Sequence, residues 1–426
     1  MGGMSRSSVH DLAAALAQRY QVANRAQRKE ILDEFLALTN YHRKSAIRIL
    51  ASAREEAKRA GSGRAVPPRA VRGSNNATCP PKQQGRRGRP RVYDPEVVAA
   101  LQALWESADY ICSRRLQPFA SKLLAALRRH GELELVPEVE AQLCRMSSST
   151  MDRLLHPYRL VHVRRGLSTT KPGTLLRNAI PVRTFTEWDD KRPGFFEGDL
   201  VAHCGESTEG FYLCTLSMVD VATGWSECVA VWGKGQDRVG SGVDAIKRRL
   251  PFPMLGLDTD NGGEFINRGL YDYCRRNEIT FTRSRSYKKN DQCYVEQKNW
   301  SVVRRVVGYD RYSSHAALAL LNEVYGYLRM YVNFFQPVLK LVSKERHGAK
   351  VHKSYDVAQT PNERLSASGL LAPAKQAEME KLYQSLNPAE LRRRIDQSLE
   401  KLWTVGEEER LSDKATRDVA KGKIGG

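Results

Sequence analysis

One long region of the chain alternates apolar runs of strand length with patterns of helical spacing. Three short apolar runs come first, with no helical pattern between them, and helix, strand, helix and strand follow. We therefore predict an α/β domain at residues 181–340, with a mixed five-stranded sheet and flanking helices. The predicted strands are 195–203, 211–219, 225–232, 254–258 and 279–283, and the predicted helices lie near 237–249 and 264–276.

The sequence before this region predicts an all-α domain at residues 7–58. Amphipathic runs on either side of a Thr39-Asn40 break indicate two short helices, of which the second is basic. This is the pattern of a helix-turn-helix, whose second helix enters the major groove of DNA. A helical hairpin with a solvated charged face would give the same pattern. The residues expected to contact DNA are Tyr41, His42, Arg43, Lys44 and Arg48.

A second helical, helix-turn-helix-like domain is predicted at residues 93–160. It opens at Asp94-Pro95, a helix-start signal, and its last helix begins within Ser147-Ser148-Ser149. That last helix is a candidate second recognition helix, although packing within the domain would explain it nearly as well.

Residues 59–92 between the two helical domains are predicted to be a flexible basic linker. From Gly61 to Val92 there is no acidic residue, and Gly, Pro, Ser, Asn and Arg predominate. The linker ends in an Arg-Gly-Arg-Pro segment that resembles an AT-hook, which lies in the minor groove of A·T-rich DNA. A solvated basic tether is an equally good explanation. The arginines concerned are Arg87, Arg89 and Arg91.

The amino-acid composition indicates which class of molecule the protein binds. The chain has 68 Lys and Arg against 48 Asp and Glu, a net charge of +20. Such a charge favours a nucleic acid, because bound cations release counterions from its backbone. No apolar stretch is long enough for a membrane span and no signal peptide is evident, so we expect a cytoplasmic protein associated with the bacterial nucleoid and with no membrane partner. The eight cysteines form no Cys-x-x-Cys pair, which argues against a zinc knuckle or a disulfide framework.

Acidic residues stand at three positions where an α/β fold places its chemistry. Asp199 interrupts a strand-like run, and Asp258 and Asp260 end another before a breaking Asn261-Gly262-Gly263 turn. Glu296 opens an apolar-periodic helix. Ligands and reactions in open α/β sheets belong at the carboxyl ends of strands. Any one of these acids alone would usually be a turn or cap residue.

Together, Asp199, Asp260 and Glu296 resemble the catalytic triad of DDE transposases and retroviral integrases. Asp260 and Glu296 are separated by 35 residues, the spacing found in that triad. The resemblance covers roughly residues 181–365 and is closest to bacterial insertion-sequence transposases with an integrase-type core. It implies a ribonuclease-H-like fold. Further landmarks in the same order are Thr223-Gly224-Trp225, Asn261-Gly262 and Val295.

The resemblance also implies a function. A DDE transposase cleaves DNA at the ends of an insertion element and joins the freed 3′-hydroxyls to target DNA. Both steps are in-line displacements at phosphorus, for which Asp199, Asp260 and Glu296 would bind two Mg²⁺ ions, with Mn²⁺ as a substitute. The partners implied are double-stranded DNA, as element ends and target, and further copies of the chain. The alternatives are a transposase-derived DNA-binding regulator with a silent core and a nuclease on the same fold.

Several cations near Glu296 are expected to contact DNA phosphates. They are Arg283, Arg285, Lys288 and Lys289 in the preceding loop, together with Lys298. Integrases have a DNA-contacting Lys one helical turn after the Glu, and here that position is Trp300, so Lys298, Arg304 or Arg305 would have to supply the contact.

Three further polar residues are assigned secondary roles. Asp258 is expected to be a supporting carboxylate outside the triad, and Glu264 is expected to cap a helix. His203 lies on the same strand face as Asp199, where it would contact DNA or a metal-bound water, or pack as a buried histidine.

The remaining residues, 341–426, are predicted to be a basic C-terminal region. It contains a helical segment from Ala374 to Trp403, which would serve either assembly or docking. The polar tail after Leu411 is expected to be disordered.

Overall fold

The computed structural model describes residues 6–39, 46, 49–50, 92–159, 192–284, 292–348 and 350–422. The chain divides into two compact units, Met1–Gly88 and Arg89–Gly426. The helices within the described residues are too short or too polar to cross a membrane.

The first unit contains a pair of helices, α1 (Arg6–Val22) and α2 (Arg25–Thr39). The turn between them is fixed by Asn24 and Gln27, whose side chains each accept a hydrogen bond from the other's backbone N–H at 3.0 Å. Helix α2 ends at Thr39, where the sequence predicts a break. The predicted recognition helix with Tyr41, His42, Arg43, Lys44 and Arg48, and the linker with Arg87, Arg89 and Arg91, lie outside the described residues.

The second unit begins with four short helices, in the region predicted to be helical. These are α4 (Pro95–Ser107), α5 (Ser113–Arg129), α6 (Pro137–Arg145) and α7 (Ser148–Leu155), with a 3₁₀ turn, η1, at His156–Tyr158. The Ser147 hydroxyl caps α7 by accepting a hydrogen bond from the Thr150 N–H at 3.3 Å. These helices pack against the α/β region. The hydroxyl of Tyr331, for example, donates to the carbonyl of Ser107 at 2.6 Å.

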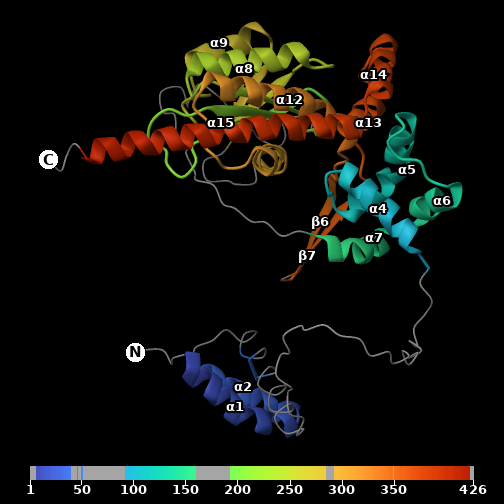
Figure 1. Ribbon diagram of the computed structural model, residues 1–426, viewed down its shortest axis with the longest axis vertical. Coiled ribbons are helices and arrows are strands. Elements are labelled where there is room, and N and C mark those ends of the chain that lie inside the picture. Colours follow the sequence, from blue (N-terminus) through green and yellow to red (C-terminus); the bar gives the residue numbers. More distant parts are fainter. Residues whose placement is uncertain are drawn as a thin grey trace, which may run out of the picture. The chain divides into compact units, whose positions relative to one another are not determined.

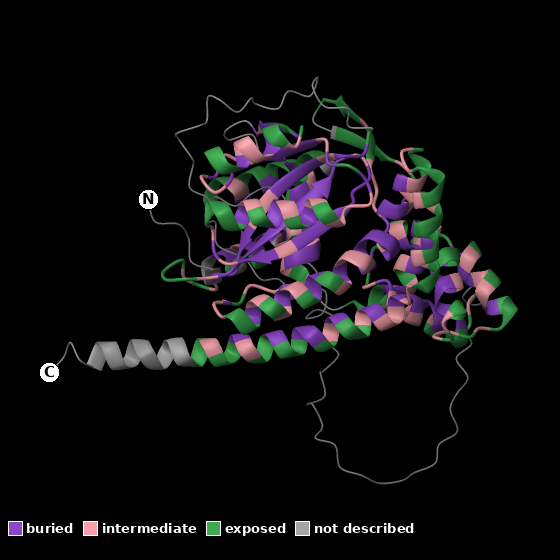
Figure 2. Ribbon diagram, turned by 90° about the horizontal axis from the view of Figure 1, so that it is seen from above, coloured by how far each residue is buried: buried purple, intermediate pink, exposed green. Residues whose placement is uncertain are grey.

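A mixed five-stranded sheet forms the centre of the second unit, as predicted. Its strand order is β3-β2-β1-β4-β5. The first three strands pair antiparallel, and β4 and β5 run parallel to β1. Figure 2 shows that these strands are mostly buried. The strands are β1 (Phe195–Ala202), β2 (Cys214–Asp220), β3 (Ser226–Val231), β4 (Gly256–Thr259) and β5 (Thr280–Arg283).

Helices cover both faces of this sheet (Figure 1). On one face lies α8 (Gln236–Arg249), where Gly242 allows close approach to Leu216 and Val231; α9 (Arg268–Arg276) packs on β5. The other face carries α10 (Cys293–Lys298), a π-helical turn η2 (Asn299–Arg304), α11 (Arg305–Val307) and α12 (His315–Phe335).

Helix α12 also satisfies the free edge of β3. The side-chain amide of Asn333 accepts from the Ser226 N–H at 2.8 Å and donates to the Ser226 carbonyl at 2.9 Å. Asn322 makes the same pair of bonds with Ala230, at 2.9 and 3.3 Å. These amides replace the missing neighbouring strand, so the edge cannot pair with another chain.

The C-terminal region departs from the sequence prediction at two places. The expected helical segment from Ala374 to Trp403 is divided at Asn387-Pro388, because proline lacks an N–H and cannot continue a helix. The tail after Leu411, expected to be disordered, is helical as far as Gly422, in a stretch without proline. The elements here are β6 (Leu341–His347), β7 (Lys350–Tyr355), α13 (Pro361–Ala367), α14 (Pro373–Ser385) and α15 (Pro388–Gly422).

Replacing Asn333 with Ala tests the role of α12 at this edge. The side chain is fully buried, so its loss leaves the Ser226 N–H and C=O without partners and without access to water. We expect the free energy of unfolding to fall by about 2–4 kcal/mol. Asn322→Ala is the matched control. Asn322 is only half-buried and water can replace it, so it should cost less. Equal costs measured by denaturant unfolding would contradict this account.

Candidate active site

Two of the three candidate acids lie side by side at the end of adjacent strands. Gly198 of β1 pairs with Thr259 of β4 in parallel register. The next residues along each strand, Asp199 and Asp260, therefore meet at the carboxyl edge of this strand pair. β1 lies between its antiparallel neighbour β2 and its parallel neighbour β4. The chain therefore continues to opposite sides of β1, and the strand order changes direction at this point of the sheet.

The turn after β4 is shaped around Asp260. The Gly262 N–H donates to Asp260 Oδ1 at 2.8 Å. A Cβ at Gly262 would lie 2.9 Å from that oxygen and 2.7 Å from the carboxyl carbon of Glu264. A side chain at this position would therefore require the Asp260 and Glu264 carboxylates to move.

A buried carboxylate attaches the helix that carries Glu296 to β1. Glu197 Oε2 accepts hydrogen bonds from the backbone N–H groups of Tyr294 and Val295, at 2.9 and 3.0 Å. These donors belong to the first turn of α10, where the partial positive charge of a helix favours an anion. Glu197 is fully buried and lies two residues before Asp199, on the same face of β1. Helix α10 is thereby fixed beside Asp199.

A second contact joins this helix to the acids. Asn299 Nδ2 donates to Asp199 Oδ2 at 2.6 Å, while Asp199 Oδ1 accepts from the Leu200 N–H at 2.7 Å. Asn299 opens the π-helical turn η2, a feature that often occurs at functional sites. The sequence analysis missed this residue. Its spacing of three from Glu296, which places both on one side of a helix, was the available signal.

Glu296 lies on α10 between these two contacts, and its side chain is exposed. The described residues contain no group of three His, Cys, Asp or Glu side chains arranged to hold a metal ion. The structure thus brings Asp199 and Asp260 together and carries the helix of Glu296 to the same strand, without placing its carboxylate between the two aspartates.

The surroundings of Asp199 and Asp260 make the ionised form of each carboxyl group less stable than it is in water. Burial, followed by the neighbouring Asp199 carboxylate, raises the pKa of Asp260 to about 7. Burial also raises the pKa of Asp199, against the opposing effects of its hydrogen bonds from Leu200 and Asn299. Two desolvated carboxylates in contact fit a divalent cation, and their hard oxygen donors are those that Mg²⁺ prefers.

The structure shows how Asp258 and His203, two of the residues given secondary roles, are buried and bonded, and it corrects the expectation for the third, Glu264. Asp258 is buried, and its Oδ1 accepts from the Thr282 hydroxyl at 2.7 Å. His203 is buried with Nε2 2.7 Å from the Thr215 hydroxyl, and burial lowers its pKa to about 3, so it is a packed neutral histidine. The expectation that Glu264 caps a helix is wrong, because α9 starts at Arg268 and is capped by Asn267.

The expected DNA contact at Lys298 does not fit the structure. Its side chain is only 8% exposed, and burial lowers its pKa to about 8. Arg304 and Arg305, the two alternatives to Lys298, also have partners within the protein. Arg304 donates to the Ala202 carbonyl at 2.7 Å, and Arg305 forms an ion pair with Asp109 at 3.2 Å. Lys298 is three residues after Val295 and four before Val302, so it lies on the apolar, inward side of the helical segment, and this spacing was the signal in the sequence. Trp300, by contrast, is 60% exposed.

Among the loop cations, the structure describes Arg283 alone. It ends β5 and its guanidinium donates to Asn261 Oδ1 at 3.2 Å, beside the Asp260 turn. Arg285, Lys288 and Lys289 lie outside the described residues.

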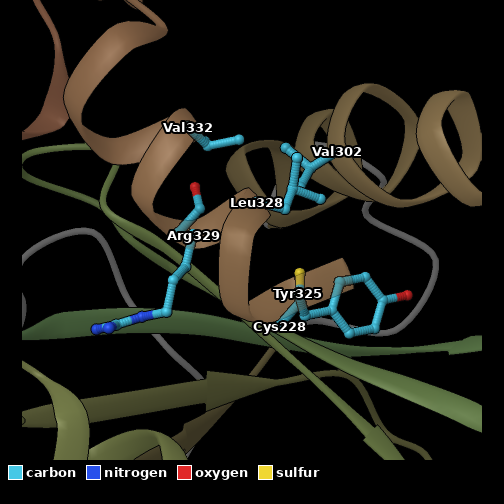
Figure 3. Close-up of a pocket in the computed structure, with 7 residues that line it drawn as sticks. Cys228, Val302, Tyr325, Leu328, Arg329 and Val332 are labelled. Carbon is cyan, nitrogen blue, oxygen red and sulfur yellow. The ribbon is translucent and has the colours of Figure 1, made fainter. Parts of the chain in front are cut away.

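A small cavity lies between β3, η2 and α12 (Figure 3). Its lining is largely apolar, and it includes the thiol of Cys228, whose pKa burial raises to about 12. None of the candidate acids lines it. The cavity is a packing feature and is separate from the aspartate pair.

Comparisons with known proteins give one curated relative and several structural likenesses. The chain is 42% identical, over 354 residues, to the "Uncharacterized protein y4rM" of Sinorhizobium fredii, covering 83% of this chain and 93% of that protein. No protein-family model matches the chain.

Similar solved structures are retroviral integrase catalytic cores. The core of BIV integrase is 16% identical, with a TM-score of 0.27, and the match covers 41% of this chain and 95% of that one. The magnesium-bound, dimeric core of HTLV-2 integrase is 15% identical, with a TM-score of 0.26, and the match covers 34% and 90%. These likenesses are too distant to carry an argument about function.

The aspartate pair predicts a pH-dependent response to Mg²⁺. An unfolded Asp has a pKa near 3.9, well below the value of about 7 for Asp260 in the fold. The stability that its proton contributes is therefore present below about pH 4 and lost as the pH rises through about 7. Mg²⁺ binds the ionised form, so it should raise the melting temperature more at about pH 8 than at about pH 5.5.

Differential scanning calorimetry at the two pH values would measure this effect. Asp260→Asn should remove most of the difference, whereas Glu206→Gln, at an exposed position in the loop after β1, should leave it. A Mg²⁺ effect that is the same at both pH values would contradict the assignment of these carboxylates as ligands.

Proposed function

We infer that this chain, which belongs to the family of the Sinorhizobium fredii protein y4rM, is a metal-dependent enzyme that transfers phosphoryl groups of DNA. More specifically, we propose a DDE transposase, which cleaves the ends of an insertion element and joins the 3′-hydroxyls to target DNA. The observation that carries the proposal is the parallel pairing of β1 and β4. It sets Asp199 beside Asp260, with the Glu296 helix bonded to the same strand.

In this proposal Asp199 and Asp260 are metal ligands, and Glu296 completes the set. Bound Mg²⁺ would polarise the scissile phosphate and favour an ionised attacking oxygen. The protein's own residues set the geometry. Glu197 holds the first turn of α10, and Asn299 orients one carboxylate oxygen of Asp199. Glu296 would have to reach the aspartates from the side of the helical segment on which Asn299, three residues later, also lies.

The nucleophiles in the two steps would be water and then a DNA 3′-hydroxyl, so no covalent bond forms between protein and DNA. The Arg283 guanidinium, at the end of β5 beside the Asp260 turn, would bind a phosphate and position the strand. Arg285, Lys288 and Lys289 are proposed to act in the same way. The helix-turn-helix regions, with Arg43 and Lys44, would recognise the element ends, and more than one copy of the chain would hold both ends.

Neutralising the acids tests this function. Asp260→Asn and Glu296→Gln keep the size of each side chain but remove a charged ligand. Because the loss of an outer-shell partner alone costs about 10–100-fold, we expect each change to lower end cleavage and strand joining together by more than about 100-fold. The assay uses duplexes from both flanks of the gene, after a check that each variant still binds them.

Asp258→Asn is the matched control. Asp258 lies on the same strand as Asp260 but is buried against Thr282, so its replacement should leave cleavage and joining within about tenfold of wild type once folding is confirmed. If Asp258→Asn were inactive and Asp260→Asn active, the ligand would be Asp258. Normal activity in all three variants would rule out the proposed mechanism.

Asn299→Ala separates positioning from metal binding. It removes the hydrogen bond to Asp199 Oδ2 without changing charge, so we expect about a 10–100-fold loss of activity. The loss should diminish as the Mg²⁺ concentration rises, since the ligands themselves remain. Gln297→Ala, at an exposed neighbouring position, is the control. A loss that Mg²⁺ does not reduce would contradict a role through Asp199.

A further inference from the structure

A solvent-exposed hairpin, made of β6 and β7, forms a two-stranded sheet separate from the five-stranded one (Figure 1). The whole of β6 is exposed except for the half-buried Ser343. Several apolar residues of the hairpin are also exposed, including Leu341 at 48% and Val342 at 69%. A two-stranded hairpin that buries so little is marginally stable by itself.

The two faces of the hairpin differ in charge. Lys344 pairs with Lys353 and Arg346 pairs with Val351, so these four side chains share one face. The other face carries Glu345, paired with His352, and His347, paired with Lys350; the His347 ring lies 3.5 Å from the Glu345 carboxylate. The cationic face, defined here as Lys344, Arg346 and Lys353, has no acidic side chain among the described hairpin residues.

This arrangement is unfavourable for the isolated protein. Like charges directly opposite each other in an antiparallel pair are destabilising, as at Lys344 and Lys353. Lysines do protect the edges of sheets from pairing, but that role does not require three cations to share a face that carries no acidic side chain. A polyanion bound against this face would relieve the repulsion.

The base of the hairpin is firmly attached. Lys340 and Asp356 exchange hydrogen bonds across it, at 2.7 and 3.0 Å, and Asp356 forms an ion pair with Arg364 of α13 at 2.7 Å. The ammonium of Lys340 also donates to the Val221 carbonyl at 2.6 Å, at the turn that follows β2. The exposed strands therefore project from a stem tied to both the sheet and α13.

We propose that the β6–β7 hairpin is a DNA-binding arm, whose cationic face contacts the phosphates of duplex DNA. A two-stranded ribbon fits the major groove of DNA, and lysine and arginine at this spacing reach phosphates along its edge. The choice of DNA as the polyanion rests on the proposed function. The contact itself lies outside the acid site and does not depend on catalysis.

Binding of duplex DNA by the full chain tests the arm. The chain carries Asp260→Asn throughout, so that cleavage does not complicate the measurement. The arm variant is Lys344→Gln, Arg346→Gln and Lys353→Gln together. The control variant is Lys381→Gln, Lys401→Gln and Arg410→Gln, three exposed cations of α14 and α15, which removes the same net charge elsewhere.

The arm variant should bind roughly 10–500-fold more weakly than the control near 0.1 M salt. Its plot of log affinity against log salt concentration should be less steep by up to about 2.7, since each lost phosphate contact contributes about 0.9. Equal affinity and slope in the two variants would overturn the arm while leaving the proposed function standing. If the unmodified chain did not bind duplex DNA at all, both would be rejected.

Lysine acetylation of the otherwise unmodified Asp260→Asn chain gives a second measurement that does not depend on the folding of the arm variant. DNA should protect Lys344 and Lys353 from acetylation, relative to Lys381 and Lys401. Unprotected Lys344 and Lys353 in a chain saturated with DNA would overturn the arm.

Discussion

The candidate site depends on one buried interaction, between the Glu197 carboxylate and the first turn of α10. Strand pairing alone brings Asp199 and Asp260 together, but the third acid is on a helix that follows residues 285–291, and strand pairing does not fix it. Glu197 supplies the fixed point by accepting two backbone N–H bonds. A fully buried carboxylate is costly unless it is satisfied in this way. The same bonds therefore satisfy Glu197 and set the position of Glu296.

Around this point, hydrogen bonds from polar side chains add to the apolar packing of η2 and α12 and set their register against the strands. Asn299 joins η2 to Asp199, Arg304 joins it to the end of β1, and Asn322 and Asn333 join α12 to β3. The aspartates are the exception. Their mutual repulsion and burial raise the pKa of Asp260, which is the condition expected of ligands whose charge is balanced by a cation.

Much of the α/β fold could be predicted from the sequence, because strand and helix periodicities are local signals. The five strands lie within a few residues of the expected ranges, and the pairing of Asp199 with Asp260 follows from their order. The roles of Glu197, Asn299 and Lys298 were missed, because each depends on which face of the helical segment packs on β1. For Asn299 and Lys298 that face was indicated only by their helical spacing from Glu296 and Val295. The exposed hairpin was also missed, since its sequence shows only a basic stretch, and its division into two faces depends on strand register.

The proposed function requires Asp199, Asp260 and Glu296 to act together as ligands of the divalent metal ions. Iron-mediated cleavage of the polypeptide tests it directly, because Fe²⁺ bound in a Mg²⁺ site reduces added hydrogen peroxide to hydroxyl radicals, which cut the nearby backbone, and ascorbate regenerates the Fe²⁺. With duplex DNA present, the account predicts three cuts, near residues 199, 260 and 296, that excess Mg²⁺ suppresses together. Cuts near 199 and 260 without one near 296, or cuts that Mg²⁺ does not suppress, would contradict it.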